Sequence, residues 1–242
     1  MIGVILAAGM ASRLRPLTDH SPKCLLKVGE RCLLQRTVDA LVANGVGELV
    51  VVTGYLHEMI EDFLKKQYPD LNIHFINNDV YQTTNNIYSL WLTRPYCEGK
   101  DILLMDSDIL CDPKIVGVML SQPGNAIALN RHECAEEEMK ICIDAENNIT
   151  DISKTCSCEE AVGESVGFEK MTTEYTSALF HELDKMMNQE HLENTFYELA
   201  FERLIKQGHT YKVIDTTEIF SMELDTVEDF ENAKANIPAE LF

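Results

Sequence analysis

Basic residues are scarce in this chain of 242 residues: Lys and Arg total 20 against 40 Asp and Glu, a formal net charge of −20. Such an anionic body repels a phosphate backbone or an anionic bilayer, so we expect no nucleic-acid partner. Long apolar runs are also missing. The longest, such as 3–10 and 49–52, fall far short of the roughly 18 residues that span a bilayer, so we expect no membrane insertion. The first residues carry no basic leader, and we expect a cytoplasmic protein.

The sequence also lacks the Cys-x-x-Cys pairs of a zinc site, although it contains eight cysteines. Their spacing is irregular, and in a chain of this length without a leader we expect reduced thiols rather than disulfides. Cys156-x-Cys158 comes closest to a metal motif, and we interpret this pair as structural or incidental thiols.

Positive charge is concentrated near the N-terminus. Residues 1–36 carry six basic side chains and only two acidic ones, a local net charge of +4 on a remainder of −24. We therefore expect a small polyanion to bind there. Hydrophobic residues at 45% and charged residues at 25% are ordinary values for a globular protein and exclude disordered and fibrous classes.

Strand-like and helix-like segments alternate through the first half, which predicts an α/β fold with a mainly parallel sheet flanked by helices. The apolar run at 2–7 is typical of a strand buried on both faces. From about residue 130 the pattern changes, and an Asn147-Asn148 turn between two short strands predicts a hairpin. We expect further strands at 48–53, 73–76, 101–105, 126–129, 139–143, 149–152, 163–168, 211–214 and 219–222, and helices at 34–42, 59–64, 87–93, 113–121, 174–190, 194–207 and 226–235. No linker or repeat interrupts the chain, so 1–242 is one domain.

The loop after the first strand is the most informative segment. Residues 6–18 read LAAGMASRLRPLT and are followed by Ser-Pro-Lys at 21–23. Open α/β sheets bind ligands at the carboxyl ends of their strands, and small side chains there let backbone N–H groups approach phosphate oxygens. A dinucleotide fingerprint is excluded because Ala11 and Leu14 stand where glycines are required, and the Gly-Lys-Ser/Thr of a P-loop is absent.

Two basic residues accompany this loop. Arg13 can hold a triphosphate bidentately, and Lys23 supplies a point charge. The alternative is a plain strand-to-helix turn with solvated basic side chains.

The whole string, together with the downstream Ser-Pro-Lys, resembles the nucleotidyltransferase (pyrophosphorylase) family, which joins a nucleoside triphosphate to a phosphorylated small molecule and releases pyrophosphate. The resemblance implies a Rossmann-like fold of the nucleotide-diphospho-sugar transferase type. It implies that Arg13 holds the β and γ phosphates and that Lys23 contacts the α phosphate. The segment implied to wrap the nucleotide comprises Leu6, Ala7, Ala8, Gly9, Met10, Ala11 and Ser12. The family usually has a glycine at position 11, and a positive φ there would strain an alanine.

Two pairs of acidic residues are candidate ligands for Mg²⁺. Asp106 and Asp108 follow the predicted strand at 101–105, and Glu223 and Asp225 follow the strand at 219–222. Alternation along an extended segment places the members of each pair on one side, where both could chelate a hard cation. The alternative is that they cap helices or lie in solvated turns. The family resemblance implies a metal held by one member of each pair, with catalysis by positioning and charge neutralisation.

Within the family, the chain is similar to the short bacterial choline-phosphate cytidylyltransferases and to their relatives that act on 2-aminoethylphosphonate. The similarity is carried by segments 81–90, 152–154, 163–167 and 223–226. It implies a nucleotide-binding half at about 1–130 and an acceptor-binding half at about 131–242. The base is then contacted by Asn78, Thr84, Asn85 and Asn86, and the acceptor by Tyr81, Tyr88, Lys154, Glu164 and Tyr197.

The sequence therefore predicts an enzyme that condenses CTP with phosphocholine, with Mg²⁺, by in-line attack on the α-phosphate. Aromatic faces and carboxylates suit a quaternary ammonium, but a primary amine would also accept them, so 2-aminoethylphosphonate remains an alternative acceptor. A sugar-1-phosphate nucleotidyltransferase is a further alternative. A non-catalytic nucleotide-sensing subunit is the rival from another class, although the cationic and acidic positions are all present. A homodimer is compatible with the sequence.

Overall fold

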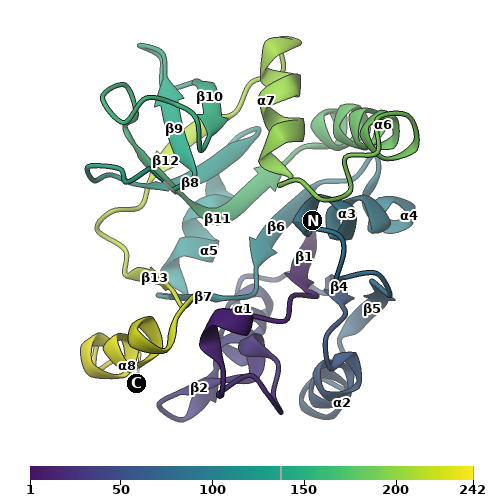
Figure 1. The fold of residues 1–242 in the computed structure, drawn as a ribbon, viewed down its shortest axis with the longest axis vertical. Helices are drawn as coiled ribbons and strands as arrows, with labels where there is room; N and C mark the ends of the chain where they lie inside the picture. The colour runs from purple at the N-terminus through teal and green to yellow at the C-terminus, as the bar shows by residue number, and fades with distance from the viewer. Residues whose placement is uncertain (137, 242) are drawn as a thin grey trace.

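A mixed sheet with helices on both faces forms the body of the protein (Figure 1). The computed structural model describes residues 1–136 and 138–241. The strands are β1 (Ile2–Ala7), β2 (Lys27–Val28), β3 (Arg31–Cys32), β4 (Glu48–Thr53), β5 (Asn72–Asn77), β6 (Ile102–Asp106), β7 (Ile109–Cys111), β8 (Ala126–Asn130), β9 (Lys140–Ile143), β10 (Ile149–Ser153), β11 (Gly163–Met171), β12 (Lys212–Asp215) and β13 (Ser221–Glu223). The α-helices are α1 (Leu33–Ala43), α2 (His57–Gln67), α3 (Asn86–Leu92), α4 (Arg94–Cys97), α5 (Lys114–Ser121), α6 (Thr173–Asn188), α7 (Glu198–Lys206) and α8 (Val227–Asn236).

The main sheet runs in the order β10-β9-β11-β6-β1-β4-β5, and β8 extends it by pairing with both β11 and β12. Strands β6, β1, β4 and β5 are mutually parallel, while β11 is antiparallel to β6 and begins the mixed part of the sheet. The carboxyl ends of β1, β4 and β6 therefore meet at one edge, where open α/β sheets bind ligands.

Strand β1 lies between two apolar layers, as its continuous apolar sequence predicts. Val4 and Leu6 pack in one cluster with side chains of α3, α6 and α7, whereas Ile5 and Ala7 pack in another with α1, α2 and α5. All six residues of β1 are buried. This two-sided packing fixes the strand from which the first loop starts.

A third, smaller apolar cluster joins the C-terminal helix to the loop after β1. Leu14 of that loop packs with Leu224 and Phe230, and the helix α8 starts at a capping box between Thr226 and Asp229. The short strand β13 pairs antiparallel with β7, with Glu223 opposite Ile109. The far end of the chain is thereby brought to the end of β6.

The predicted order of elements is confirmed. The strands expected at 2–7 and 48–53 have the observed bounds, and most other predicted elements differ by only a few residues; the helix predicted from 194 starts at 198, and β11 extends three residues beyond 168. The fold class, a mixed and mainly parallel α/β sheet, is also confirmed. The sequence analysis missed the short strands β2, β3 and β7 and the helix α4, because two to four residues carry too little periodicity to be recognised.

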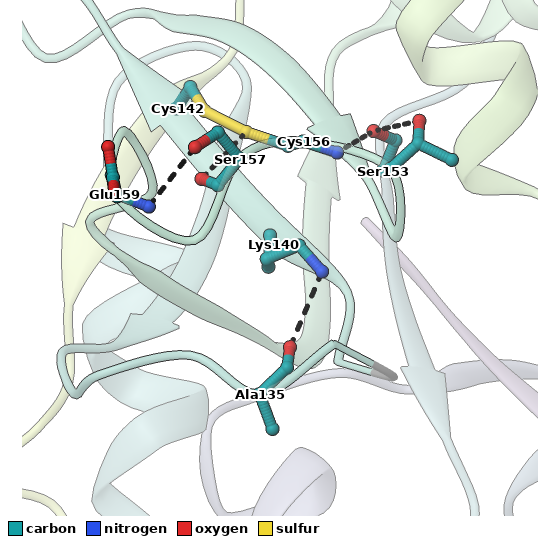
Figure 2. Close-up of a disulfide and its surroundings, with 8 residues drawn as sticks. Ala135, Lys140, Cys142, Ser153, Cys156, Ser157 and Glu159 are labelled. Carbon is teal, nitrogen blue, oxygen red and sulfur yellow. Dashed lines mark hydrogen bonds between the residues drawn. A yellow bond between two sulfur atoms is a disulfide. The ribbon is translucent and has the colours of Figure 1, made fainter.

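One pair of cysteines is oxidised, whereas the sequence analysis predicted that all eight are reduced. Cys142 on β9 and Cys156 in the loop after β10 form a disulfide (Figure 2). The prediction of reduced thiols is therefore wrong for this pair, because the β9–β10 hairpin and the loop that follows bring together two cysteines 14 positions apart. The other six cysteines, Cys158 among them, are free. None of the helices in the described residues is long and apolar enough to cross a membrane.

Gly54, directly after β4, allows two segments to approach closely. A Cβ at this position would lie 2.7 Å from the carbonyl oxygen of Ala8 and 3.1 Å from the Cβ of Tyr81. Any larger side chain must push the loop after β1 away from the loop after β5. At Gly47, by contrast, a Cβ would meet no atom within 4 Å.

We predict that Gly54→Ala lowers the free energy of unfolding by about 1 to 3 kcal/mol, the usual cost of overpacking. The matched control Gly47→Ala should change it by no more than about 0.5 kcal/mol. Denaturant unfolding of the two variants and the parent protein measures both values. Equal stability of the two variants would contradict the close-approach argument.

Candidate active site

A cavity of about 390 Å³ opens at the carboxyl ends of β1 and β6. It is lined by the loop after β1, by the segment around Lys23, by residues 78–89, by the end of β6 and by the end of β13. The sequence predicted this position from the buried first strand alone. The cavity is thus built from segments more than 200 residues apart in the chain.

The loop after β1 turns sharply at Ala11, which has φ 46° and ψ 53°, in the left-handed region. The side chain of Thr18 donates to the carbonyl oxygen of Ala11 at 3.0 Å and closes the turn. An alanine in this conformation is strained, as expected for a position where the resembling family has glycine. Tyr55 fixes the loop from the other side, with its N–H donating to the carbonyl of Ala8 at 3.0 Å.

Lys23 connects two of the predicted metal ligands. Its Nζ donates to Asp108 Oδ2 at 3.0 Å and to Asp225 Oδ1 at 2.8 Å, and its side chain is only 10% exposed. Arg13, which is largely exposed, pairs with the other oxygen of Asp225. Ligand oxygens of Asp108, Glu223 and Asp225 lie within 4.8 Å of one another. Three carboxylates and two cations therefore share one corner of the cavity.

The pKa shifts at this corner follow from burial and from crowded charge. Burial opposes the charge on Lys23, but Asp108 and Asp225 outweigh it and hold the pKa of Lys23 above its usual value. Burial, together with the negative charges of Asp108 and Asp225, raises the pKa of Glu223 to about 8. The pKa of Asp225 is lowered despite burial, because Lys23 donates to it. Negative charge at this corner is only partly compensated.

Asp106 belongs to a different group of side chains. The hydroxyl of Tyr197 lies 2.9 Å from Asp106 Oδ2 and 3.5 Å from Glu169 Oε1, and Glu198 follows Tyr197 at the start of α7. Burial, with neighbouring carboxylates, raises the pKa of Asp106 and of Glu169, and burial raises that of Glu198 to about 7. Within the described residues, the Oε2 atoms of Glu169 and Glu198 are buried without a hydrogen-bond partner. Asp106, Glu169 and Glu198 thus form a cluster of three carboxyl groups with raised pKa values.

Most of the predicted site residues line the cavity. These are Leu6, Ala7, Ala8, Gly9, Ala11, Arg13, Lys23, Asn78, Tyr81, Thr84, Asn85, Asn86, Asp106, Asp108, Glu223 and Asp225. Asn78 is almost fully buried, and its amide donates to Thr84 and Ser89, so it also holds this wall together.

Six predicted residues lie elsewhere. Met10, Ser12, Tyr88, Lys154 and Tyr197 are outside the lining of this cavity, and Glu164 lines a second cavity of about 210 Å³ beside Glu223. Tyr197 is fully buried and its phenol points to Asp106 and Glu169, which leaves it behind the wall rather than on it.

Phe196, in the cavity lining, and Glu169, behind it, are among the residues that sequence analysis did not predict. Phe196 lines the cavity, although sequence analysis predicted its neighbour Tyr197 as the acceptor-binding residue. The ammonium of Lys154 lies 4.8 Å from the centre of the Phe196 ring. Glu169, in the middle of β11, gave no signal because an acidic residue in a strand predicts a solvated face. Strand β11 and helix α7 are separated in the chain, and only the fold brings Glu169 close to Tyr197.

The sheet order, the small-residue loop at the end of β1 and the carboxylates at the ends of β6 and β13 define an α/β protein with a charged cavity at the carboxyl ends of its parallel strands, the position where open α/β sheets bind ligands. Residues 3–186, more than half of the chain, match the MobA-like NTP transferase domain, and the chain belongs to this family. The resemblance to nucleotidyltransferases is thereby confirmed.

Individual relatives have related printed activities. A CMP-5'-(3-aminopropyl)phosphonate synthase of Streptomyces rubellomurinus is 33% identical over 53% of this chain and 20% of its own. A choline-phosphate cytidylyltransferase of Streptococcus pneumoniae is 37% identical over 39% of each chain. These alignments thus span well under half of either relative.

The fold is also that of a solved structure. The CTP:phosphocholine cytidylyltransferase from Streptococcus pneumoniae superposes with a TM-score of 0.81 at 21% identity, covering 98% of this chain and 99% of the other.

Proposed function

We propose that this protein is a cytidylyltransferase, which condenses CTP with a small cationic phosphate ester and releases pyrophosphate. The observation that carries the proposal is the corner where Lys23 bridges Asp108 and Asp225 beside the small-residue loop. A loop that admits phosphates, next to paired cations and carboxylates, suits transfer of a nucleotidyl group. CTP is chosen because the printed names of two relatives, a CMP-5'-(3-aminopropyl)phosphonate synthase and a choline-phosphate cytidylyltransferase, contain a cytidine nucleotide or cytidylyl group.

Asp108, Glu223 and Asp225 form a donor set that fits Mg²⁺. They are three carboxylates, the ligand type that Mg²⁺ prefers, and Asp108 Oδ1 is a buried oxygen without a hydrogen-bond partner in the residues described. Bound there, the ion would neutralise charge on the nucleotide phosphates and on the departing pyrophosphate. Asp106 does not join this set in the structure, because Tyr197 holds its carboxylate and the chain turns at Ser107.

The rest of catalysis would come from positioning the two substrates. The backbone of residues 6–12 would wrap the triphosphate, and Arg13 would hold its β and γ phosphates. Lys23 would contact the α phosphate, which the acceptor attacks. Lys23 must then exchange part of its contact with Asp108 and Asp225 for the nucleotide. The acceptor phosphate is already an anion, so no general base is required. Alignment of the two substrates and neutralisation of their charge would supply most of the rate enhancement.

The acceptor is proposed to be phosphocholine. Three carboxyl groups, of Asp106, Glu169 and Glu198, lie at or behind the cavity wall, and two of them have a buried oxygen without a hydrogen-bond partner among the described residues. Such a wall favours a positively charged head group over a neutral sugar. Phe196 presents a ring on which the ammonium of Lys154 already rests, and a trimethylammonium group can use the same face. Lys154 would then leave the ring for the acceptor phosphate, the role that the family resemblance implies for it.

One second candidate is supported by a specific observation. The printed name of one relative, a CMP-5'-(3-aminopropyl)phosphonate synthase, contains a phosphonate with a primary amine, and the oxygens of Glu169 and Glu198 that lack a partner among the described residues could accept hydrogen bonds from such an amine. The acceptor 2-aminoethylphosphonate therefore competes with phosphocholine. A sugar-1-phosphate is disfavoured by the same carboxyl groups: burial raises their pKa values, so they gain charge only beside a cation, which a neutral hydroxyl does not supply.

Pyrophosphate release with a panel of nucleotides and acceptors tests this assignment. With Mg²⁺, we expect CTP and phosphocholine to give the highest kcat/KM, with UTP, dTTP and glucose 1-phosphate at least tenfold lower. Higher activity with 2-aminoethylphosphonate would select the second candidate. Turnover only with a sugar phosphate and UTP or dTTP would contradict the proposal.

A single substitution tests the aromatic face. Phe196→Leu keeps apolar bulk but removes the ring, and loss of a cation–π contact of about 1 to 2 kcal/mol should raise the KM for phosphocholine roughly tenfold. The KM for CTP should stay within about twofold. The matched control is Phe63→Leu, on α2 and outside the cavity lining, which should leave both KM values unchanged. A normal KM for phosphocholine in Phe196→Leu would remove the ring from the acceptor site.

A further inference from the structure

A second set of metal-ligating side chains lies apart from the active-site carboxylates. His132, Cys134 and Glu138, in the loop between β8 and β9, each offer one ligand atom, and these atoms lie within 4.8 Å of one another. Around a tetrahedral zinc ion with ordinary bond lengths, ligand atoms are about 3.3 to 3.6 Å apart. His132 Nε2 and Glu138 Oε2 are 2.9 Å apart and would separate slightly to bind an ion, while the Cys134 thiol, within 4.8 Å of both ligand atoms, would complete the set.

The loop is held in shape by contacts that leave these three side chains on one side. Buried Lys140, at the start of β9, donates to the carbonyl oxygens of Ala135 and Glu136 at 3.3 and 2.8 Å, and Figure 2 shows the first of these bonds beneath the Cys142–Cys156 disulfide. Glu138 in addition accepts from the N–H of Ala135 at 2.9 Å. These bonds hold Ala135, Glu136 and Glu138 near the start of β9.

The negative charge around the loop also favours binding of a cation. Glu164 lies 3.8 Å from His132, so two carboxylates face a single imidazole. Cys134 is a free thiol outside the disulfide, and burial with the nearby charges of Glu138 and Glu164 raises its pKa. A divalent ion would offset this negative charge and favour the thiolate.

We propose that His132, Cys134 and Glu138 bind a divalent cation of the zinc type. A thiolate with an imidazole selects a borderline cation such as Zn²⁺ over Mg²⁺, which prefers oxygen ligands. Binding releases the Cys134 proton to solvent and replaces the His132–Glu138 hydrogen bond with two metal bonds. Three protein ligands leave the fourth tetrahedral position for water, and the ion ties the loop to the start of β9.

Cobalt titration of the metal-free protein, with the Cys142–Cys156 disulfide intact and Cys134 as the free thiol, tests the site. Co²⁺ alone should produce a thiolate-to-cobalt charge-transfer absorption that saturates at one ion per chain. Zn²⁺ should abolish this absorption, and excess Mg²⁺ should not. Cys134→Ser should remove the band, and His132→Ala and Glu138→Gln should each weaken binding by about tenfold or more.

Two controls locate the ion. Cys158→Ser removes a neighbouring thiol, and Asp108→Asn alters the active-site carboxylates; both should keep the band, because neither residue belongs to the proposed ligand set. A band that persists in Cys134→Ser, that is lost in Cys158→Ser, or that is lost in Asp108→Asn overturns the assignment. Absence of any band in the parent protein overturns it as well.

Discussion

The ion pairs that Lys23 makes with Asp108 and Asp225 are the interaction on which the site depends. Without a cation between them, Asp108, Glu223 and Asp225 would repel one another within 4.8 Å in a partly buried corner. Lys23 reaches this position from the first forty residues, whereas Asp225 belongs to the last twenty. One side chain therefore joins the two ends of the chain and holds these carboxylates together.

The fold makes this possible through strand ends. The turn after β6 places Asp108 beside β7, and the pairing of β7 with β13 carries Glu223 and Asp225 to the same edge. The helix α8 closes the arrangement from outside, with Phe230 packed beside Leu14 of the first loop. A purely local motif could not collect these charges, since each carboxylate pair alone is an ordinary helix cap or turn.

Sequence reasoning recovered what is local or periodic. The apolar run of β1, its small-residue loop and the basic residues Arg13 and Lys23 placed the cavity correctly. Alternation failed for Asp106, because β6 ends there and the chain turns, so Asp106 faces Tyr197 while Asp108 joins the distant carboxylates. The place of Phe196 in the cavity lining and the contact of buried Glu169 with Tyr197 depend on where the fold puts the segment before α7, and no spacing in the sequence encodes that position.

A double-mutant cycle between Lys23 and Asp225 tests the central interaction most directly. The free energy of unfolding is measured by denaturant for the parent, Lys23→Met, Asp225→Asn and the double variant, without added metal. A hydrogen-bonded and largely buried ion pair predicts a coupling energy of about 1 to 3 kcal/mol. The exposed pair of Arg13 with the same carboxylate should give less than about 1 kcal/mol. Coupling below about 0.3 kcal/mol between Lys23 and Asp225 would contradict the account.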